Sequence, residues 1–145
     1  MAAASNIVLA DAQATPVNHT FIPLGPDANG VWWFEDQSAA SPIGYNRISV
    51  ELKRPLNGKQ GEDSSKRVAR VKVGVHTPKL ETLSNSTVSG ISPAPTVSYI
   101  PRCNVEFILP ERMALQDRKD LRKYVQYVLA DTNVVNAIEN LQGIW

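Results

Sequence analysis

The chain has 145 residues and a net charge of +1 at pH 7, with 43% hydrophobic and 20% charged residues. This composition is typical of a folded soluble protein, and the length suits a single domain, 1–145, built around one hydrophobic core. No apolar run reaches the roughly 18–20 residues that cross a membrane, and the first residues lack the charged and apolar regions of a secretory signal peptide, which predicts a cytoplasmic product without a membrane partner.

The first part of the chain predicts β-strands. Apolar segments at 7–9 and 20–24 flank a polar stretch and predict an N-terminal hairpin within residues 1–25. Residues 26–30 end in Asn-Gly, a pair that adopts positive φ at little steric cost, so we expect a tight turn there. An aromatic strand over 31–34 is expected to follow the turn.

Two basic strands are the most distinctive feature of the sequence. Residues 47–53 and 67–75 each alternate with period two, which places charged or polar side chains on one face of a sheet and aliphatic ones on the other. Residues 47–79 contain nine Lys or Arg against three acids, whereas the rest of the chain contains six against eleven. Such a basic segment suits a phosphate backbone, although a solvated sheet face with interspersed Lys and Arg is the simpler interpretation.

Two loops and a broken strand complete the predicted sheet region, 30–110. The loop 55–65 connects the two basic strands. The stretch 77–97 is rich in Ser, Thr, Pro and Gly and predicts a long exposed loop, a feature that usually has a function such as contacting a neighbour. A last strand is expected over 99–109, with an interruption at Pro101.

The character of the sequence then changes to helical. Apolar residues at helical spacing predict one helix over 115–130, and a second helix that is capped at 131–132 and ended by Gly143. Because all strands precede both helices, which lie within 114–142, the order indicates an α+β fold in which helices cover one face of an antiparallel sheet.

This layout has features that a monomer does not explain. Five or six strands and two helices cannot cover both faces of a broad sheet, and a short helix of about ten residues is marginal unless it docks. The strand 31–34 is apolar on both faces, and such a strand at a free sheet edge tends to pair with another chain. A homodimer that extends the sheet and docks its helices on the partner would satisfy both requirements.

On these residues the chain resembles the coat proteins of the single-stranded RNA bacteriophages, the levivirus family. The resemblance extends over almost the whole length, and its most specific part is the ending, 134–145, which is similar to the short helix and aromatic terminus of several family members. The segments that carry it are 5–9, 29–31, 47–53, 67–75, 104–110 and 134–145. No single segment is diagnostic, but their order and spacing, taken together, agree with the family pattern.

The resemblance implies an N-terminal β-hairpin, a five-stranded antiparallel sheet and two C-terminal helices that interlock in a homodimer with a continuous ten-stranded sheet. It also implies that the dimers self-assemble into an icosahedral shell, usually of triangulation number three, whose sheets face the single-stranded RNA genome. In such a virion, assembled in the cytoplasm of the bacterial host, the loop 77–97 would cluster around the five-fold and quasi-six-fold axes. The loop 55–65 would meet neighbours near the three-fold axes.

The resemblance further implies an RNA site on the sheet. Family members bind an RNA hairpin at the replicase start site, repress its translation, and hold an unpaired adenine in a pocket of small polar and basic side chains. Carried over by strand position, the pocket and its surroundings here would consist of Val31, Arg47, Ser49, Glu51, Lys53, Arg70, Lys72, Arg102, Asn104 and Glu106. Of these, Lys53, Arg70 and Lys72 are the preferred RNA contacts, since Lys and Arg neutralise phosphates.

Two positions depart from the family pattern. Arg102 stands where many members have a base-stacking Tyr, so stacking there would have to use a guanidinium plane. Glu51 places a carboxylate where a small hydroxyl is common, and it repels phosphate unless it is paired, for example with Arg70. These two departures are compatible with genome packaging, which needs only a basic face. They put the recognition of one particular hairpin in doubt.

Other functions remain as alternatives. The rival hypothesis is a non-assembling dimeric RNA-binding translational regulator that uses the same sheet and has no need of the long loop 77–97. The aromatic residues of 31–34 are more typical of core and dimer packing than of base-stacking platforms.

Catalysis and metal binding have little support. None of the common nucleophile, phosphate-loop or zinc-protease motifs occurs, so we expect no enzyme and no cofactor. His19 and His76 lie far apart without an acid or Cys at ligand spacing, which predicts no metal site. Cys103 is the only cysteine, which excludes an intrachain disulfide.

Overall fold

A computed structural model of the chain describes residues 3–82, 90–91 and 93–144. The chain divides into two compact units: residues 1–54 with 69–108 form unit 1, and residues 55–68 with 109–145 form unit 2. The assignment of the whole chain to one domain stays a prediction.

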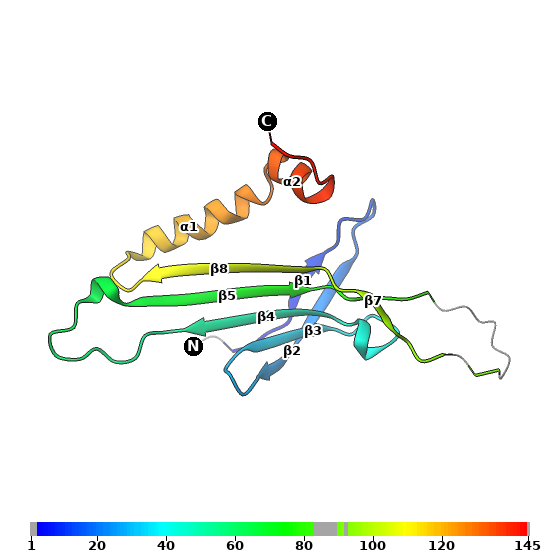
Figure 1. Cartoon of the computed structure of the whole chain (residues 1–145), viewed down its shortest axis with the longest axis horizontal. Coiled ribbons are helices and arrows are strands. Elements are labelled where there is room, and N and C mark those ends of the chain that lie inside the picture. The colour runs from blue at the N-terminus through cyan, green and yellow to red at the C-terminus, as the bar shows by residue number, and fades with distance from the viewer. Residues whose placement is uncertain (1–2, 83–89, 92, 145) are drawn as a thin grey trace. The chain divides into compact units, whose positions relative to one another are not determined.

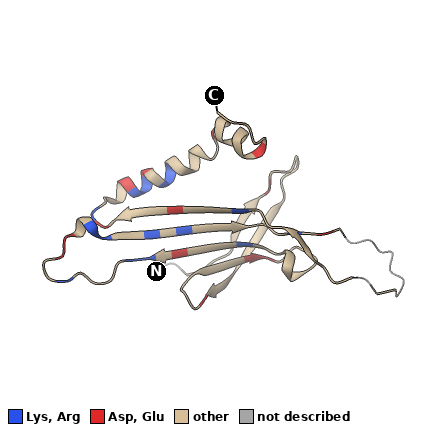
Figure 2. Cartoon of the chain, in the orientation of Figure 1, with Lys and Arg blue, Asp and Glu red and all other residues tan. Residues whose placement is uncertain are grey.

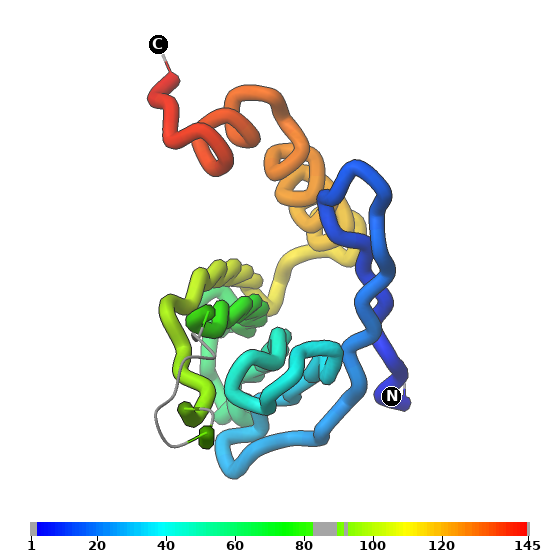
Figure 3. Tube along the Cα trace, turned by 90° about the vertical axis from the view of Figure 1, so that its right-hand side faces the viewer, coloured from blue at the N-terminus to red at the C-terminus, as the bar shows by residue number. Residues whose placement is uncertain are grey.

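Unit 1 contains a sheet with the strand order β1-β2-β3-β4-β5-β8 (Figure 1). Its strands are β1 (Ile7–Ala10), β2 (Asn18–Pro26), β3 (Trp32–Asp36), β4 (Asn46–Lys53), β5 (Val68–His76) and β8 (Arg102–Pro110), of which the terminal residues of β5 and β8 belong to unit 2. The first part of β2 pairs with β1, and the second part pairs with β3. The predicted N-terminal hairpin and five-stranded antiparallel sheet are therefore confirmed. The hairpin runs at a steep angle to β4, β5 and β8 (Figures 1 and 3).

The turn between β2 and β3 is the one that Asn-Gly predicts. Gly30 has a φ of 78° and donates its N–H to the Asp27 carbonyl at 3.0 Å. The Asp27 carboxylate accepts the N–H groups of Asn29 and Val31 at 2.8 and 3.0 Å. Val31 consequently belongs to the turn, and the strand starts one residue later, at Trp32.

The core of unit 1 lies on the aliphatic face of the sheet. Phe21, Phe34 and Ile48 are its buried hydrophobic residues among the described part of the chain. Phe34 pairs with Ile48 across β3 and β4, and Ile48 pairs with Val75 across β4 and β5, so every second residue faces the core. The predicted alternation is confirmed, and the opposite face of the same strands is left for polar side chains.

The segment predicted as a long loop, 77–97, begins and ends in regular structure. Strand β6 (Lys79–Leu80) pairs antiparallel with β7 (Val97–Tyr99), and Pro42–Gly44 forms the 3-10 helix η1 beside β6. Residues 83–89 and 92 of the predicted loop lie outside the described residues. The predicted interruption of the last strand at Pro101 is confirmed, because β7 ends at Tyr99 and β8 begins at Arg102.

Unit 2 contains both helices, α1 (Leu115–Val128) and α2 (Thr132–Glu139). Asp131 caps α2 as predicted, since its carboxylate accepts the N–H of Asn133 at 2.9 Å. The prediction that Gly143 ends this helix is wrong. The helix ends at Glu139, and Leu141 takes a left-handed φ of 54°, so the chain turns two residues before the glycine.

The loop 55–65 in unit 2 is attached to the start of the helical segment through one arginine. Arg67 donates to the Glu111 carboxylate and to the Leu56 carbonyl, and its Nη1 lies 3.1 Å from Glu62. The 3-10 helix η2 (Ser64–Lys66) precedes Arg67. Within the part of the chain that the structure describes, no helix is long and apolar enough to cross a membrane.

Candidate nucleic-acid interface

Cross-strand pairing gathers the candidate residues of β4 and β5 on one face of the sheet. Arg47 pairs with His76, Ser49 with Gly74, Glu51 with Lys72, and Lys53 with Arg70. Because side chains alternate along each strand, these positions share the face opposite the core. We define the charged face by the following residues of the described strands: Trp33, Glu35, Arg47, Ser49, Glu51, Lys53, Arg70, Lys72, Gly74, His76, Arg102, Asn104 and Glu106.

Strand β8 adds its candidates to the same face. Glu106 contacts Arg70 on the neighbouring strand, and a Cβ atom built on Gly74 would lie 3.1 Å from the Asn104 side-chain oxygen. The same Cβ would lie 2.6 Å from the Ser49 hydroxyl. Glycine at position 74 therefore lets the polar groups of Ser49 and Asn104 approach the β5 backbone closely. Sequence reasoning missed this residue because the close approach depends on two other strands.

Acidic positions lie among basic ones on β4, β5 and β8 (Figure 2). Each carboxylate of the charged face forms an ion pair with a cation. Lys53 Nζ is 2.7 Å from Glu51, so the suggested pairing of Glu51 with Arg70 is wrong. Arg70 Nη1 instead donates to Glu106 at 3.0 Å, because β8 lies beside β5 and brings a second carboxylate within reach. Lys72 Nζ is 4.0 Å from the same Glu106 oxygen.

The cations of the charged face remain accessible despite these contacts. The side chains of Lys53, Arg70 and Lys72 are 62%, 51% and 52% exposed. Ion pairs this exposed contribute only about 0–1 kcal/mol, so an approaching phosphate can compete for the cations. Five cationic side chains stand against three carboxylates on the face, which makes it positive but less so than the composition of 47–79 indicates.

The aromatic residues of β3 divide between the two faces. Phe34 is in the core, as predicted, whereas Trp33 lies on the charged face opposite Ser49. The rings of Trp33 and His76 meet edge to face with centroids 6.0 Å apart, and Trp33 Nε1 donates to Asp27 at 3.2 Å. Trp33 therefore lies outside the core of unit 1, and its packing in a dimer stays a prediction.

A second polar cluster holds the hairpin to the end of β3. His19 Nδ1 lies 2.8 Å from Asp36, and its Nε2 lies 3.3 Å from Asp11. The hydrogen bonds with Asp36 and Asp11 raise the pKa of the His19 imidazole above its ordinary value. Burial raises the pKa of the Asp36 carboxyl, but the hydrogen bonds from His19 and Ser38 outweigh this effect and lower it overall. Sequence spacing missed the cluster because strand pairing assembles it.

No group of three or more His, Cys, Asp or Glu side chains suited to a metal ion occurs among the described residues. Cys103 is a free, exposed thiol on β8.

Comparison with known proteins defines the class to which this fold belongs, the phage capsid proteins. The chain is 30% identical over 142 residues to the capsid protein of Pseudomonas phage PRR1, with 97% of each chain covered. Its fold matches a solved chain of the virus-like particle of bacteriophage ESE058 with a TM-score of 0.92, 49% identity, and coverage of 99% of this chain and 100% of that one. For the virus-like particle of bacteriophage NT-214 the TM-score is 0.83, with 28% identity and coverage of 99% and 100%.

The model of the Levivirus coat protein family matches residues 2–145, and the chain belongs to this family. It is accordingly a structural capsid protein of the virion and not an enzyme.

Proposed function

We propose that the chain forms homodimers that assemble into an icosahedral shell of triangulation number three, and that the charged face binds the enclosed single-stranded RNA. The 49% identical chain of bacteriophage ESE058 belongs to a virus-like particle, which supports assembly of this chain into a shell. The dimer, the RNA contact and translational repression each have support from particular residues.

Dimer formation is supported by surfaces that have no partner among the described residues. Strand β8 is the last strand in the sheet order, so its outer edge can pair with β8 of a second copy and extend the sheet to ten strands. Neither α1 nor α2 contains a buried residue, and the apolar side chains of Tyr124, Tyr127 and Ile138 are exposed. Interlocking these helices across the dimer would bury them, which short helices need for stability.

The RNA contact is supported by one observation above all: five cations from three adjacent strands share the charged face. They are Arg47, Lys53, Arg70, Lys72 and Arg102. Contacts between these side chains and phosphates release counterions, and this favours a shell closed around RNA. Each dimer would carry two copies of the charged face. The positive charge that it presents to the RNA would therefore be twice that of one subunit.

Repression of replicase translation through an RNA hairpin is supported by two polar side chains that lie close to Gly74 on the charged face. The Ser49 hydroxyl and the Asn104 amide flank it, and both groups can donate and accept hydrogen bonds at the edge of an unstacked base. An unpaired adenine is the base that the levivirus resemblance implies.

Electron microscopy of the purified chain tests the shell. Closed particles of uniform size would exclude the non-assembling regulator, whereas free dimers at all concentrations would contradict the shell.

A double variant, Arg70→Ala with Lys72→Ala, tests the charged face. We expect less packaged RNA and, with dimers intact, a salt dependence of RNA binding that is shallower by about 0.7 for each phosphate that the variant no longer neutralises. The matched control removes two exposed charges from α1, Arg118→Ala with Lys119→Ala, and should retain the RNA. Equal RNA content in both double variants would contradict the assignment of the face.

A further inference from the structure

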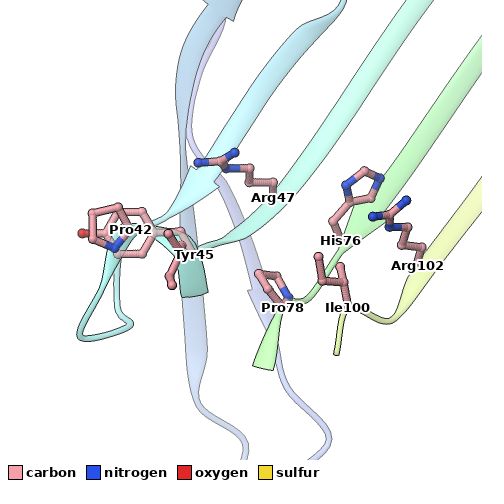
Figure 4. A pocket seen from close by; sticks show the side chains of 8 residues that line it. Pro42, Tyr45, Arg47, His76, Pro78, Ile100 and Arg102 are labelled. Carbon is pink, nitrogen blue, oxygen red and sulfur yellow. The ribbon is translucent and has the colours of Figure 1, made fainter. Parts of the chain in front are cut away.

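Arginines of the charged face are open to solvent, whereas one arginine of unit 2 is enclosed. The Arg47 side chain is 47% exposed, and in the pocket that it lines its guanidinium points away from Arg102 (Figure 4). The Arg67 side chain is only 12% exposed, although it directly follows η2 at the end of the loop 55–65. A guanidinium with so little access to water depends on the protein for its hydrogen bonds, because an unpaired charge is costly to bury.

The loop 55–65 closes on the Arg67 guanidinium at three points. Nη2 donates to the Leu56 carbonyl, and Nη1 lies 3.1 Å from the Glu62 carboxylate. A Cβ atom built on Gly58 would lie 3.6 Å from Nη1, so the backbone between these two points packs against the guanidinium. Glu62 also accepts the N–H of Lys59 at 2.9 Å. One side chain thus fixes the loop near its start, its middle and its end.

A further contact joins this loop to the segment that leads into α1. Arg67 Nε donates to the Glu111 carboxylate, and the Arg67 carbonyl accepts the Glu111 N–H at 2.9 Å. The guanidinium therefore has acceptors on three sides: two carboxylates and a backbone carbonyl. Arginine can satisfy them together because its five N–H donors form a planar fork, whereas a lysine ammonium is a point charge that would leave part of the set unpaired.

The loop held in this way exposes an apolar side chain. Leu56 is 89% exposed, more than any other large hydrophobic residue in the part of the chain that the structure describes. Its carbonyl is fixed by Arg67 while its side chain is in solvent. Because the backbone is already ordered, a surface that buried Leu56 would gain the apolar contact without the entropy cost of ordering the loop.

We propose that Arg67 is a positioning residue for assembly: it holds the loop 55–65 in the conformation that presents Leu56 to a neighbouring dimer of the same chain. The inference rests on the proposed shell and deepens it, since it assigns particular residues to one contact between dimers.

A second copy of this chain is the occupant that the other surfaces leave for Leu56. The proposed dimer uses the outer edge of β8 and the two helices, and the proposed RNA contact uses the charged face; the loop 55–65 belongs to neither. A shell needs additional contacts that join one dimer to the next, and the 49% identical chain of bacteriophage ESE058 belongs to a virus-like particle. RNA is a poor alternative, because phosphates are bound by cationic and polar groups and not by an aliphatic side chain.

The variant Arg67→Lys in full-length dimers tests the positioning role. Light scattering after addition of single-stranded RNA gives the dimer concentration at which particles form, and hydrogen exchange in free dimers reports on 55–65. We expect faster exchange across the loop and an increase of about tenfold in that concentration, the effect of losing one buried leucine contact. Dimer formation and RNA binding by the dimer should be unchanged, a result that general misfolding would not give. Lys66→Ala removes the adjacent exposed cation and should behave like the parent chain.

Variants at Leu56 separate the contact from its positioning. Leu56→Ala should raise the concentration for assembly about tenfold without changing hydrogen exchange of the loop. Leu56→Met keeps an apolar side chain of similar volume and should assemble like the parent chain. When combined with Leu56→Ala, Arg67→Lys should add little, because the position of residue 56 matters only while the leucine is present.

Several outcomes would overturn the inference. Unchanged exchange of the loop in Arg67→Lys would show that Arg67 does not hold it, and faster exchange with unchanged assembly would show that assembly does not depend on its conformation. Assembly of Leu56→Ala at the concentration of the parent chain would exclude Leu56 as the contact. If Arg67→Lys forms no dimers, Glu62→Gln, which weakens only one contact of the guanidinium, has to show the faster exchange and weaker assembly instead. In all these cases the parent chain still forms particles; only their absence from the parent would contradict the proposed shell, and the inference with it.

Discussion

Ser49 and Gly74 face each other across β4 and β5, and a methyl group on residue 74 would lie 2.6 Å from the Ser49 hydroxyl. We therefore expect Gly74→Ala to displace the hydroxyl by a rotation and to crowd the Asn104 side chain, whose oxygen would lie 3.1 Å from the new methyl group. Binding of an adenine-containing RNA hairpin should weaken about two- to tenfold, the range for one disturbed hydrogen bond. Titration of the labelled hairpin measures this.

The control for this variant is Gly143→Ala, since nothing lies within 4 Å of a Cβ at that position. It should bind the hairpin like the parent chain. Unchanged binding by Gly74→Ala would show that Ser49 and Asn104 do not contact a base of the hairpin.

Glu106 restrains two cations of the charged face, because one of its oxygens is 3.0 Å from Arg70 and 4.0 Å from Lys72. Replacing it by Gln should release both cations for phosphates. We expect tighter binding of single-stranded RNA by about two- to fivefold at low salt, and a steeper loss of binding as salt rises. Glu139→Gln removes an exposed charge from α2 and should have no such effect. Weaker RNA binding by Glu106→Gln would mean that Glu106 itself accepts hydrogen bonds from RNA.

The cluster of His19, Asp11 and Asp36 predicts a dependence of stability on pH. The pKa of His19 is raised, so its contribution is complete below its ordinary value of 6.5 and is lost as the pH rises through the raised pKa. The pKa values of Asp11 and Asp36 are lowered, so their contributions are present above 3.8 and are lost as the pH falls through the lowered values. The cluster therefore stabilises the hairpin most strongly between these two limits.

Urea unfolding of the parent chain and of His19→Asn at pH 5.5 and 8.5 measures this contribution. Between pH 5.5 and 8.5, the free energy of unfolding should fall more in the parent chain than in His19→Asn. Only the parent has the imidazole proton that Asp11 and Asp36 stabilise and that is lost at pH 8.5. Equal losses in the two proteins would show that the imidazole is not charged in the folded state.

The small core of unit 1 makes Phe34 sensitive to truncation. Phe34 is 9% exposed and is one of three buried hydrophobic residues in the described core, so Phe34→Ala should lower the free energy of unfolding by about 3–5 kcal/mol. Leu56→Ala, at a residue that is 89% exposed, should change it by no more than about 0.5 kcal/mol. Denaturant unfolding at one protein concentration compares the two, since dimer stability depends on concentration. A small loss for Phe34→Ala would mean that a partner surface and not this core supports the sheet.

The elements themselves followed from local patterns in the sequence. The alternation of 47–53 and 67–75 indicated two strands with one polar face, and Asn-Gly at 29–30 indicated the turn, because each pattern expresses the backbone geometry of neighbouring residues. The helix predicted over 115–130 followed in the same way from the spacing of its apolar residues, and α1 ends two residues earlier, at Val128. The end of α2 was not predicted correctly. The helix was expected to end at Gly143, but the residue that adopts the left-handed conformation after it is Leu141.

The chemistry of the charged face was decided by tertiary structure. The register between strands determines which cation each carboxylate neutralises. It also determines the close approach of Ser49 and Asn104 to Gly74 and the position of Trp33 against His76. The pairing of Arg70 with Glu106 joins residues 36 positions apart, and His19 meets an aspartate 17 positions away. Alternation along one strand tells which face a side chain occupies, but only the pairing of distant strands determines which side chains touch.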